Sequence, residues 1–318
     1  MNKGVMLAAF FLLAAVSGCG KVDEPERIDP NYKPTEPVIK EEDYTIDVSG
    51  WAGKKNSDNG VICSFNIRLS SGEDGDNSWP NRSCSVGRFL RFAIPDVIGF
   101  QEVKADQKNF VIAEVGAKYH YTGLDRDNGQ EEGPGETAFL MASRDRYTLA
   151  FSGTFWLSPT PNAVSRGWDA ACNRTVTWVC LTDKFWQKDI YVFNTHFDHV
   201  GVEARKNEGP LLISKIKEIT GVGDLKNSAV PIFVTGDFNA TYDSEYLAPL
   251  RENFQNARNA SPETDSRNTF NSFKDTGGSI IDHIFFTGVT PVKYLVVTEG
   301  FGVPYLSDHY PIWFEYSK

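Results

Sequence analysis

The sequence predicts an α+β protein whose strands form a β-sandwich. Short apolar runs recur along the chain with turn residues between them, a spacing typical of two packed sheets. The composition agrees, because only three Met are set against 22 Phe and 12 Tyr, and aromatic residues favour strands. Longer segments with apolar residues at helical spacing indicate helices as well. With 318 residues, 41% of them hydrophobic, the chain has ample material for a large core.

The N-terminal segment is predicted to direct export and lipid attachment. Residues 1–18 combine a basic start with an apolar stretch that is too short to span a bilayer comfortably. The stretch ends at Gly18-Cys19, which resembles the lipobox of bacterial lipoproteins, and this implies cleavage before Cys19 and lipidation of its thiol. An ordinary signal peptide that ends near a cysteine is the alternative. We therefore expect a lipid-anchored protein of the cell envelope, either periplasmic or on the outer surface.

Residues 19–45 are predicted to form a flexible tether, because they are charged, contain four prolines and show no apolar period. Residues 46–318 are predicted to form one domain, since neither an internal repeat nor a second boundary is visible. We expect this domain to be monomeric. The net charge of −10 argues against a broad binding surface for long duplex DNA. It is compatible with a local site at which a divalent cation supplies positive charge.

Four cysteines remain once Cys19 is assigned to lipid. An oxidising compartment permits disulfides among them, whereas zinc ligation would need closer Cys-x-x-Cys spacing. Buried free thiols are the alternative, and the sequence leaves the choice open. These cysteines are Cys63, Cys84, Cys172 and Cys180.

The first half of the predicted domain alternates strands with helices. An apolar run over 60–68 reads as the first strand, and 95–102 reads as a second strand that ends in a polar residue. Phe89, Leu90 and Phe92 mark a helix between them, and another helix is expected over 107–117. Further strand patterns cover 138–141, 148–152, 154–157, 174–181 and 189–195.

In the second half, a helix is expected over 203–220, and Gly209-Pro210 should break or kink its first half. An apolar run over 230–234 reads as a buried strand, and a surface helix follows near 244–251. The polar run that follows, 251–275, is expected to be a loop. The last strands expected are 279–286 and 312–316.

Asp237 and Asn239 directly follow the buried strand at 230–234, and Gly236 allows a sharp exit from it. Two residues apart in extended chain, their side chains share one face. A carboxylate beside a carboxamide can hold a hard cation, a water molecule and a phosphate oxygen. The alternative is an ordinary turn, because Asp and Asn are favoured where strands stop.

Polar residues also end or interrupt other predicted strands. Four of the five histidines lie in such motifs, and Asp282 stands inside an apolar run, where an unpaired carboxylate would be costly. If the strand ends meet on one rim of a sandwich, they form a pocket suited to Mg²⁺ or Mn²⁺ and to metal-assisted phosphoryl transfer. The polar residues that end or interrupt strands are Asn66, Glu102, His196, Asp237, Asn239, Asp282, Asp308 and His309.

Taken together, these strand-end motifs resemble those of the endonuclease/exonuclease/phosphatase superfamily. The resemblance implies a deoxyribonuclease I-like fold, a four-layer α/β-sandwich of two packed, mainly antiparallel sheets flanked by helices. A stretch at 153–158 also looks like a secreted bacterial lipoprotein branch of that superfamily. The motifs that carry the resemblance are Phe65-Asn66, Gly99-Phe100-Gln101-Glu102, Asn194-Thr195-His196, Gly236-Asp237-Phe238-Asn239, Ile281-Asp282-His283-Ile284 and Ser307-Asp308-His309.

The resemblance also implies a role for each residue. Glu102 is expected to be the main metal carboxylate, helped by Asn66 and Asp308. Asp237 is expected to position and deprotonate the attacking water, and Asn239 to hold that water or the scissile phosphate.

The histidines complete the implied machinery. His309, oriented by Asp282, is expected to act on the phosphate or as an acid or base. His196 is expected to donate to a non-bridging oxygen as charge builds up in the transition state.

Three positions depart from the family pattern, namely Ala142, Ile281 and His283, and the departures remove groups that could contact a phosphate chain or a base. Arg174 is a candidate replacement, although a surface salt bridge is at least as good an explanation for it. Glu136 is a separate substrate candidate, because it stands between a polar loop and a strand.

The leading hypothesis is an exported, divalent-metal-dependent phosphodiesterase of the nuclease kind. The alternative is the same chemistry on a phosphomonoester such as a sugar phosphate, or on a phospholipid or sphingomyelin headgroup. The loop around Trp168 favours lipid and the acidic charge disfavours duplex DNA. A non-catalytic binding lipoprotein is a third hypothesis, disfavoured because Asp237 and His309 are both present.

Overall fold

The computed structural model describes residues 58–274 and 276–318. The predicted signal peptide (1–18), the lipidated Cys19, the tether (19–45) and the start of the domain at residue 46 lie outside these residues. Within the described residues, no helix combines the length and apolar character needed to cross a membrane.

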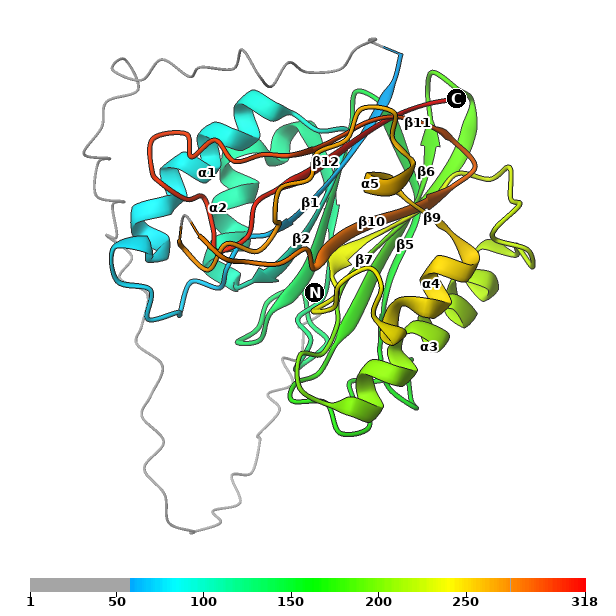
Figure 1. Cartoon of the computed structure of the whole chain (residues 1–318), viewed down its shortest axis with the longest axis horizontal. Helices are drawn as coiled ribbons and strands as arrows, with labels where there is room; N and C mark the ends of the chain where they lie inside the picture. The colour runs from blue at the N-terminus through cyan, green and yellow to red at the C-terminus, as the bar shows by residue number, and fades with distance from the viewer. Residues whose placement is uncertain (1–57, 275) are drawn as a thin grey trace, which may run out of the picture. The chain divides into compact units, whose positions relative to one another are not determined.

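Two six-stranded sheets form the centre of the described domain (Figure 1). Each sheet contains one parallel pair, β1 with β2 and β7 with β8, and every other pairing is antiparallel. In spatial order the first sheet consists of β11 (Thr290–Val296), β12 (Ile312–Ser317), β1 (Gly60–Asn66), β2 (Val97–Val103), β4 (Thr137–Ser143) and β3 (Tyr119–Thr122). The second consists of β5 (Tyr147–Trp156), β6 (Thr175–Asp183), β7 (Lys188–His196), β8 (Ile232–Asp237), β10 (Asp282–Thr287) and β9 (Gln255–Asn256).

Helices cover the outer face of each sheet. In Figure 1, α1 and α2 lie on the side of the first sheet, and α3 and α4 lie on the side of the second. The helices are α1 (Trp79–Ala93), α2 (Ala105–Val115), α3 (Val202–Thr220), α4 (Ala248–Asn253) and α5 (Ala257–Ala260), with short 3₁₀ turns η2 (Gly75–Asn77), η3 (Gly116–Lys118) and η4 (Glu245–Leu247).

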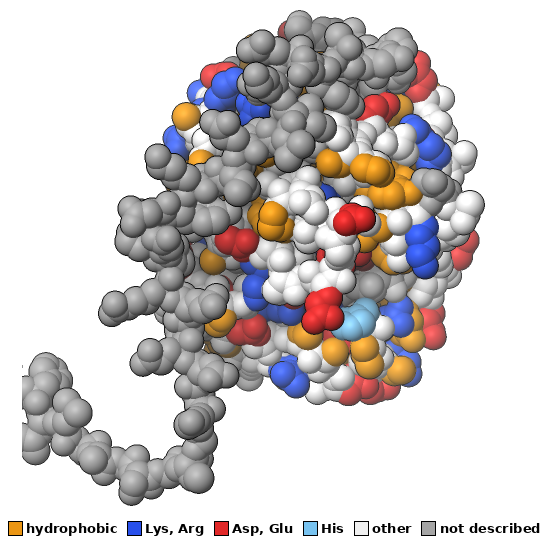
Figure 2. Space-filling view, turned by 90° about the vertical axis from the view of Figure 1, so that its left-hand side faces the viewer, with side chains coloured by type: hydrophobic (Ala, Val, Ile, Leu, Met, Phe, Trp, Pro, Cys, Tyr) orange, Lys and Arg blue, Asp and Glu red, His pale blue; other side chains and the backbone are white. Residues whose placement is uncertain are grey.

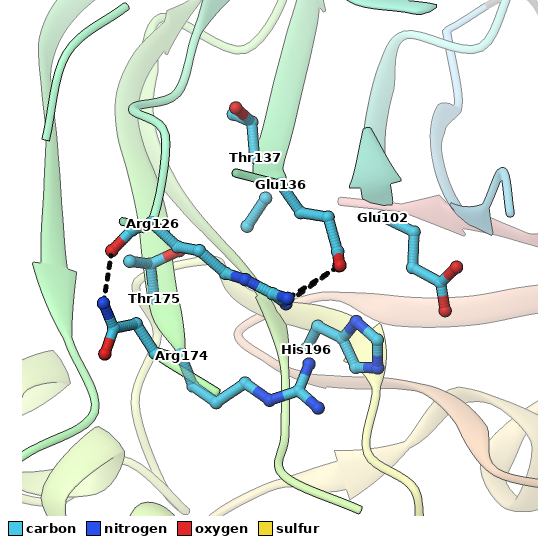
Figure 3. A pocket seen from close by; sticks show the side chains of 9 residues that line it. Glu102, Arg126, Glu136, Thr137, Arg174, Thr175 and His196 are labelled. Carbon is cyan, nitrogen blue, oxygen red and sulfur yellow. Dashed lines mark hydrogen bonds and ion pairs between the residues drawn. The ribbon is translucent and has the colours of Figure 1, made fainter. Parts of the chain in front are cut away.

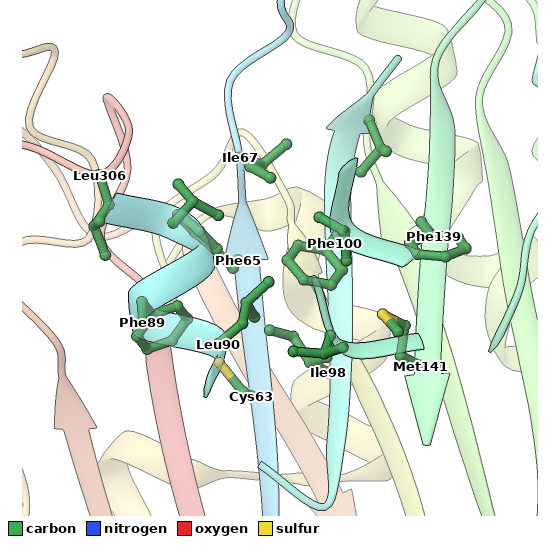
Figure 4. Close-up of a cluster of buried hydrophobic side chains, with 14 of the residues drawn as sticks. Cys63, Phe65, Ile67, Phe89, Leu90, Ile98, Phe100, Phe139, Met141 and Leu306 are labelled. Atoms are coloured by element: carbon green, nitrogen blue, oxygen red, sulfur yellow. The ribbon is translucent and has the colours of Figure 1, made fainter. Parts of the chain in front are cut away.

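Strand β1 shows why the layers form. Its residues are buried on both faces, so the strand reads as a continuous apolar run. Cys63 and Phe65 point to the helices and pack with Phe89 and Phe100 in the cluster drawn in Figure 4. Ile62 points the other way, into the core between the two sheets. A third apolar cluster lies between the second sheet and α3. The predicted sandwich of mainly antiparallel sheets flanked by helices is therefore confirmed.

Several element boundaries differ from those expected. Residues 148–152 and 154–156 belong to one strand, β5, because β6 pairs with it along its whole length, and residue 157 lies just beyond its end. Helix α3 runs through Gly209-Pro210 without interruption, so the break expected there was wrong, whereas the kink given as the other expectation stays a prediction. Its apolar face packs against the second sheet, and this burial outweighs one missing backbone hydrogen bond. Gly209 also lets the chain at Tyr246 approach closely, within 3.1 Å of where a β-carbon would stand.

Three edge strands, β3, β11 and β9, and one short helix were not expected. Strand β3 is only four residues long, and β11 carries Pro291, which a sheet tolerates at its edge. The segment 251–275, expected to be a loop, contains the end of α4, strand β9 and helix α5. All four cysteines of the described domain are free thiols.

Candidate active site

The polar residues predicted to form a site gather where strands of both sheets end. Strands β7 and β8 are parallel, and β10 is antiparallel to β8. The last residues of β7 and β8 therefore lie beside the first residue of β10. The register places Asp237 opposite His196 on one side and opposite Asp282 on the other. Asn66 is the last residue of β1 in the first sheet, and it contacts Asp237 across the sandwich.

Asp237 is the central residue of this site and is almost fully buried. Its Oδ2 accepts a hydrogen bond from Asn66 Nδ2 at 3.0 Å and lies 3.5 Å from His196 Nε2 and 3.6 Å from His309 Nε2. Burial raises the pKa of Asp237 to about 7, although the charge of His309 opposes the shift and that of Asp282 adds to it. A carboxylate with this pKa is suited to accept a proton near neutral pH.

His309 lies between two carboxylates. Its Nδ1 is 2.8 Å from Asp282 Oδ2, and its Nε2 faces Asp237. Burial lowers the pKa of His309, but the charges of Asp282 and Asp237 outweigh burial and raise it to about 10. The imidazole is therefore held as a cation whose orientation Asp282 fixes.

Asn239 orients His196. It adopts a left-handed backbone conformation (φ 49°), and its Nδ2 donates to the Phe197 carbonyl and to His196 Nε2, both at 3.0 Å. Its own N–H donates to Asp237 Oδ1, so Asn239 also fixes that carboxylate. Burial, together with Arg174 and Arg126, holds the pKa of His196 well below its usual value. Because Nε2 accepts a hydrogen bond, the neutral ring carries its proton on Nδ1.

Glu102 lies where the pairing of β2 with β4 shifts register, and it takes a positive φ of 63°. Such a conformation is uncommon outside glycine and marks a residue that its surroundings hold in place. Here Asn66 Nδ2 donates to Glu102 Oε1 at 3.1 Å and the Leu69 N–H donates to Oε2 at 3.0 Å. Arg68 lies 4.0 Å from Glu102 and 3.8 Å from Asp308. The predicted metal ligands thus lie together, with Asp308 linked to the others through Arg68.

The oxygen atoms of these side chains suit a hard divalent cation. Among the described residues, two sets of three could offer ligand atoms within 4.8 Å of one another, Glu102 with His196 and Asp237, and Asp237 with Asp282 and His309. Asp308 belongs to neither set, so its expected role as a metal ligand stays a prediction.

Residues 63–309 match the model of the Endonuclease/Exonuclease/phosphatase family. The chain belongs to this family. Its members are hydrolases that act on phosphate esters. No curated protein matches the chain in sequence.

Solved structures agree with this assignment. An endonuclease/exonuclease/phosphatase from Bacteroides vulgatus is 35% identical, with a TM-score of 0.74 over 81% of this chain and 98% of that one. A family protein from Bacteroides thetaiotaomicron is 27% identical, with a TM-score of 0.74 and coverage of 81% and 97%. A mannosyl-6-phosphatase from Bacteroides thetaiotaomicron is 28% identical, with a TM-score of 0.74 and coverage of 81% and 100%. The expected deoxyribonuclease I-like fold is thereby confirmed.

A small pocket adjoins the site at Glu102 and His196 (Figure 3). Both substrate candidates from the sequence, Glu136 and Arg174, line it. Arg174 also makes a salt bridge, since its Nε donates to Asp198 at 3.3 Å, but both side chains are buried, so this is not the surface pair considered as its alternative role.

Two arginines near the candidate site, Arg126 and Arg68, were not predicted from the sequence to belong to it. Arg126 lines the pocket and pairs with Glu136, but it lies in a polar loop that gave no signal. Arg68 was detectable in principle, because it follows the strand that ends at Asn66. His283, counted among the motif histidines, faces away from the site and bonds to the Ala240 carbonyl.

Proposed function

We propose that this chain is an exported phosphoesterase that depends on a divalent metal and hydrolyses its substrate with water activated by Asp237. The observation that carries the proposal is the position of Asp237, buried between His196 and His309 and bonded to the asparagine that also contacts Glu102. This arrangement requires residues from both sheets to converge. An ordinary strand-end turn gives no reason for that convergence.

Mg²⁺ or Mn²⁺ would be held by Glu102 with Asn66 and Asp308, whose oxygen donors suit a hard cation, and metals of this kind are general in the family. When bound, the cation supplies positive charge that offsets the charge of the phosphate. Arg68, which contacts both Glu102 and Asp308, would limit the repulsion between these carboxylates.

The protein's own side chains carry out the proton transfer and hold the phosphate. Asp237 accepts the proton of the attacking water, and Asn239 holds its carboxylate in place. His309, kept cationic by Asp282, hydrogen-bonds to the phosphate as negative charge grows on it. His196 is neutral, so it stabilises the phosphate as a hydrogen-bond donor and not as a charge.

Two kinds of ester are candidates. The order of the motifs supports a phosphodiester of the nuclease kind. The 28% identity to a protein described as a mannosyl-6-phosphatase supports a phosphomonoester. The net charge of −10 disfavours long duplex DNA, and acidic and basic side chains are interspersed on the described part of the face drawn in Figure 2.

Hydrolysis of bis-(para-nitrophenyl) phosphate and para-nitrophenyl phosphate, with Mg²⁺ or Mn²⁺ and after EDTA treatment, tests both candidates. We expect metal-dependent turnover of at least one ester. Asp237→Asn should lower kcat by about 10²-fold to 10⁴-fold, because the amide cannot accept the proton of water. No metal-dependent turnover on any phosphoester, or full activity of Asp237→Asn, would refute the proposal.

We also propose that the protein is anchored to the cell envelope through lipid on Cys19, with residues 19–45 as a tether and residues 46–318 as one monomeric domain. The sequence at Gly18-Cys19 supports this. Detergent-phase partitioning tests it, since Cys19→Ser should move the protein to the aqueous phase. Unchanged partitioning would contradict the anchor.

A further inference from the structure

The pocket beside the site is lined mainly by polar and charged residues. They include Thr137 and Thr175 at strand ends and charged groups from the neighbouring loops, with Ala138 as the one aliphatic residue. The imidazole of His196 is the one aromatic ring among its described lining residues. Glu102 and His196 belong both to this pocket and to the candidate active site, so a phosphate at the site would place the rest of the substrate in reach of the pocket.

Three nitrogen atoms of the lining residues have no hydrogen-bond partner among the described groups. They are Arg126 Nε, Arg174 Nη1 and His196 Nδ1, and all three are buried. Arg174 is only 3% exposed. In Figure 3 the two guanidinium groups and the imidazole point into the same pocket, with Glu102 at one side. Buried donors are normally paired, so these three favour a substrate that offers acceptor oxygens, a phosphate oxygen to His196 and other oxygens to the two arginines.

The charges of the two arginines are already matched. Arg126 donates to both oxygens of Glu136, at 2.8 and 2.7 Å, and Arg174 donates to Asp198. A second anion would therefore meet little net positive charge in the pocket. A hydroxyl group fits better, because its oxygen can accept from a guanidinium N–H while its hydrogen is donated to a carboxylate such as that of Glu136.

We propose that this pocket binds neighbouring hydroxyl groups of the alcohol part of the substrate, so that the substrate is a phosphate ester of a carbohydrate. The assignment deepens the proposed phosphoesterase function and rests on it. A nucleoside also carries neighbouring hydroxyls, but the described lining has no Phe, Tyr or Trp ring on which a base could stack, and the His196 imidazole is assigned to the phosphate.

Hexose 6-phosphates compared with their deoxy analogues provide the kinetic test, because each pair shares the same scissile bond. Loss of a bound hydroxyl leaves its pocket partner unpaired, so at least one deoxy analogue should show a kcat/KM about tenfold or more below its parent. Equal kcat/KM values for all parents and deoxy analogues, or higher values for nucleoside 5′-monophosphates, would overturn the assignment.

Two conservative variants test whether the pocket residues cause the preference for the parent hexose phosphate over its deoxy analogue. Glu136→Gln removes a carboxylate acceptor, and Arg126→Lys keeps the positive charge but lacks the Nε–H donor. Both should reduce the discrimination between parent and deoxy analogue by about tenfold. Glu132→Gln, at an exposed position of the same loop, is the matched control and should leave it unchanged. Unchanged discrimination in both pocket variants would contradict the proposal.

Binding of methyl hexosides to the EDTA-treated wild-type protein, followed by saturation-transfer NMR, gives a readout that needs neither metal nor catalysis. We expect transfer to the sugar hydrogens that decreases in Glu136→Gln. Turnover of nitrophenyl esters without sugar binding or sugar preference would overturn the pocket assignment and leave the phosphoesterase proposal standing. Sugar binding without turnover of any phosphoester would overturn the phosphoesterase proposal and leave the sugar-binding role of the pocket standing.

Discussion

Asp282 and His283 are neighbours in the chain, but they face opposite sides of β10. Asp282 turns toward the site and pairs with His309, whereas His283 bonds to the Ala240 carbonyl and packs against Phe238. Burial lowers the pKa of His283 to about 4, so its ring is neutral at physiological pH. The alternation of a strand therefore separates a carboxylate of the candidate site from a histidine that belongs to the core.

This contrast predicts different effects for two adjacent substitutions. Asp282→Asn should reduce kcat by about 10²-fold or more, because His309 loses both its orientation and the charge that keeps it protonated. His283→Gln should lose some stability but keep kcat, because Gln retains a polar group near Ala240. Steady-state kinetics with thermal denaturation of both variants checks this. A larger loss of kcat in His283→Gln than in Asp282→Asn would contradict the assignment.

At the level of elements, a polar network holds the two sheets together beneath the site. Asn194 on β7 accepts from Gln101 Nε2 at 2.7 Å and from Thr235 Oγ1 at 3.0 Å. Its Nδ2 donates to the carbonyls of Phe100 and Phe139 in the other sheet. One fully buried side chain on β7 thus satisfies four groups on three other strands, β2, β4 and β8. This network keeps the strand that carries Glu102 in register with the strand that carries His196.

Asn194→Ala should therefore destabilise the protein by on the order of 3 kcal/mol, because it leaves several buried polar groups unpaired. Urea denaturation in EDTA measures this without a contribution from metal binding. Thr154→Ala is a suitable control, since its hydroxyl bonds only to Thr177 and is partly exposed. If the two variants lost similar stability, the network would not have the role given to it.

Helix α3 carries a second buried carboxyl group. Both oxygens of Glu208 accept from the Asp198 N–H, at 3.2 and 3.0 Å. Burial raises the pKa of Glu208 to about 8, far above its ordinary value of about 4.3 in an unfolded chain. Between these two values the folded protein binds more protons than the unfolded chain. Ionisation of Glu208 therefore lowers stability progressively as the pH rises from about 4 to about 8.

Glu208→Gln should remove this dependence, because the amide stays neutral at every pH. Relative to wild type, the variant should gain stability between pH 5 and pH 8, by on the order of a few kcal/mol. Denaturation series at several pH values in EDTA measure the difference. A constant difference across that range would show that Glu208 is ionised with an ordinary pKa.

At the scale of the whole molecule, the sequence was sufficient to predict the sandwich and the residues at its rim. Strands buried on both faces give unbroken apolar runs, and a polar residue at the end of such a run, like Asn66, is visible without a structure. Strand β11 was missed because an edge strand is half exposed and tolerates Pro291. The break expected at Pro210 failed because local propensity yields to the packing of α3.

The composition of the pocket could not be predicted in the same way. Arg126 lies in a polar loop, and only the folded chain brings its guanidinium group to Glu136 and Arg174. The pairing of Asn66 with Asp237 joins residues 171 positions apart, and no periodic pattern encodes such a contact. Sequence patterns indicate which elements form, whereas the contacts between loops depend on how the layers stack.

Metal binding should stabilise the whole domain. The site brings the partly buried Glu102 together with the buried Asp237 and Asp308, and a cation bound there stabilises only the native state. At a concentration of Mg²⁺ about a hundredfold above Kd, the gain is about 2.7 kcal/mol, which corresponds to a Tm increase of roughly 5–10 °C.

Glu102→Gln should lose most of this increase, because it removes the proposed main ligand, whereas the exposed Glu132→Gln should keep it. Differential scanning calorimetry with and without Mg²⁺ measures the Tm of each variant. An equal increase in wild type and Glu102→Gln would mean that Mg²⁺ stabilises the protein elsewhere. The metal site would then have to be reassigned among the remaining carboxylates, with Asp308 as the first to test.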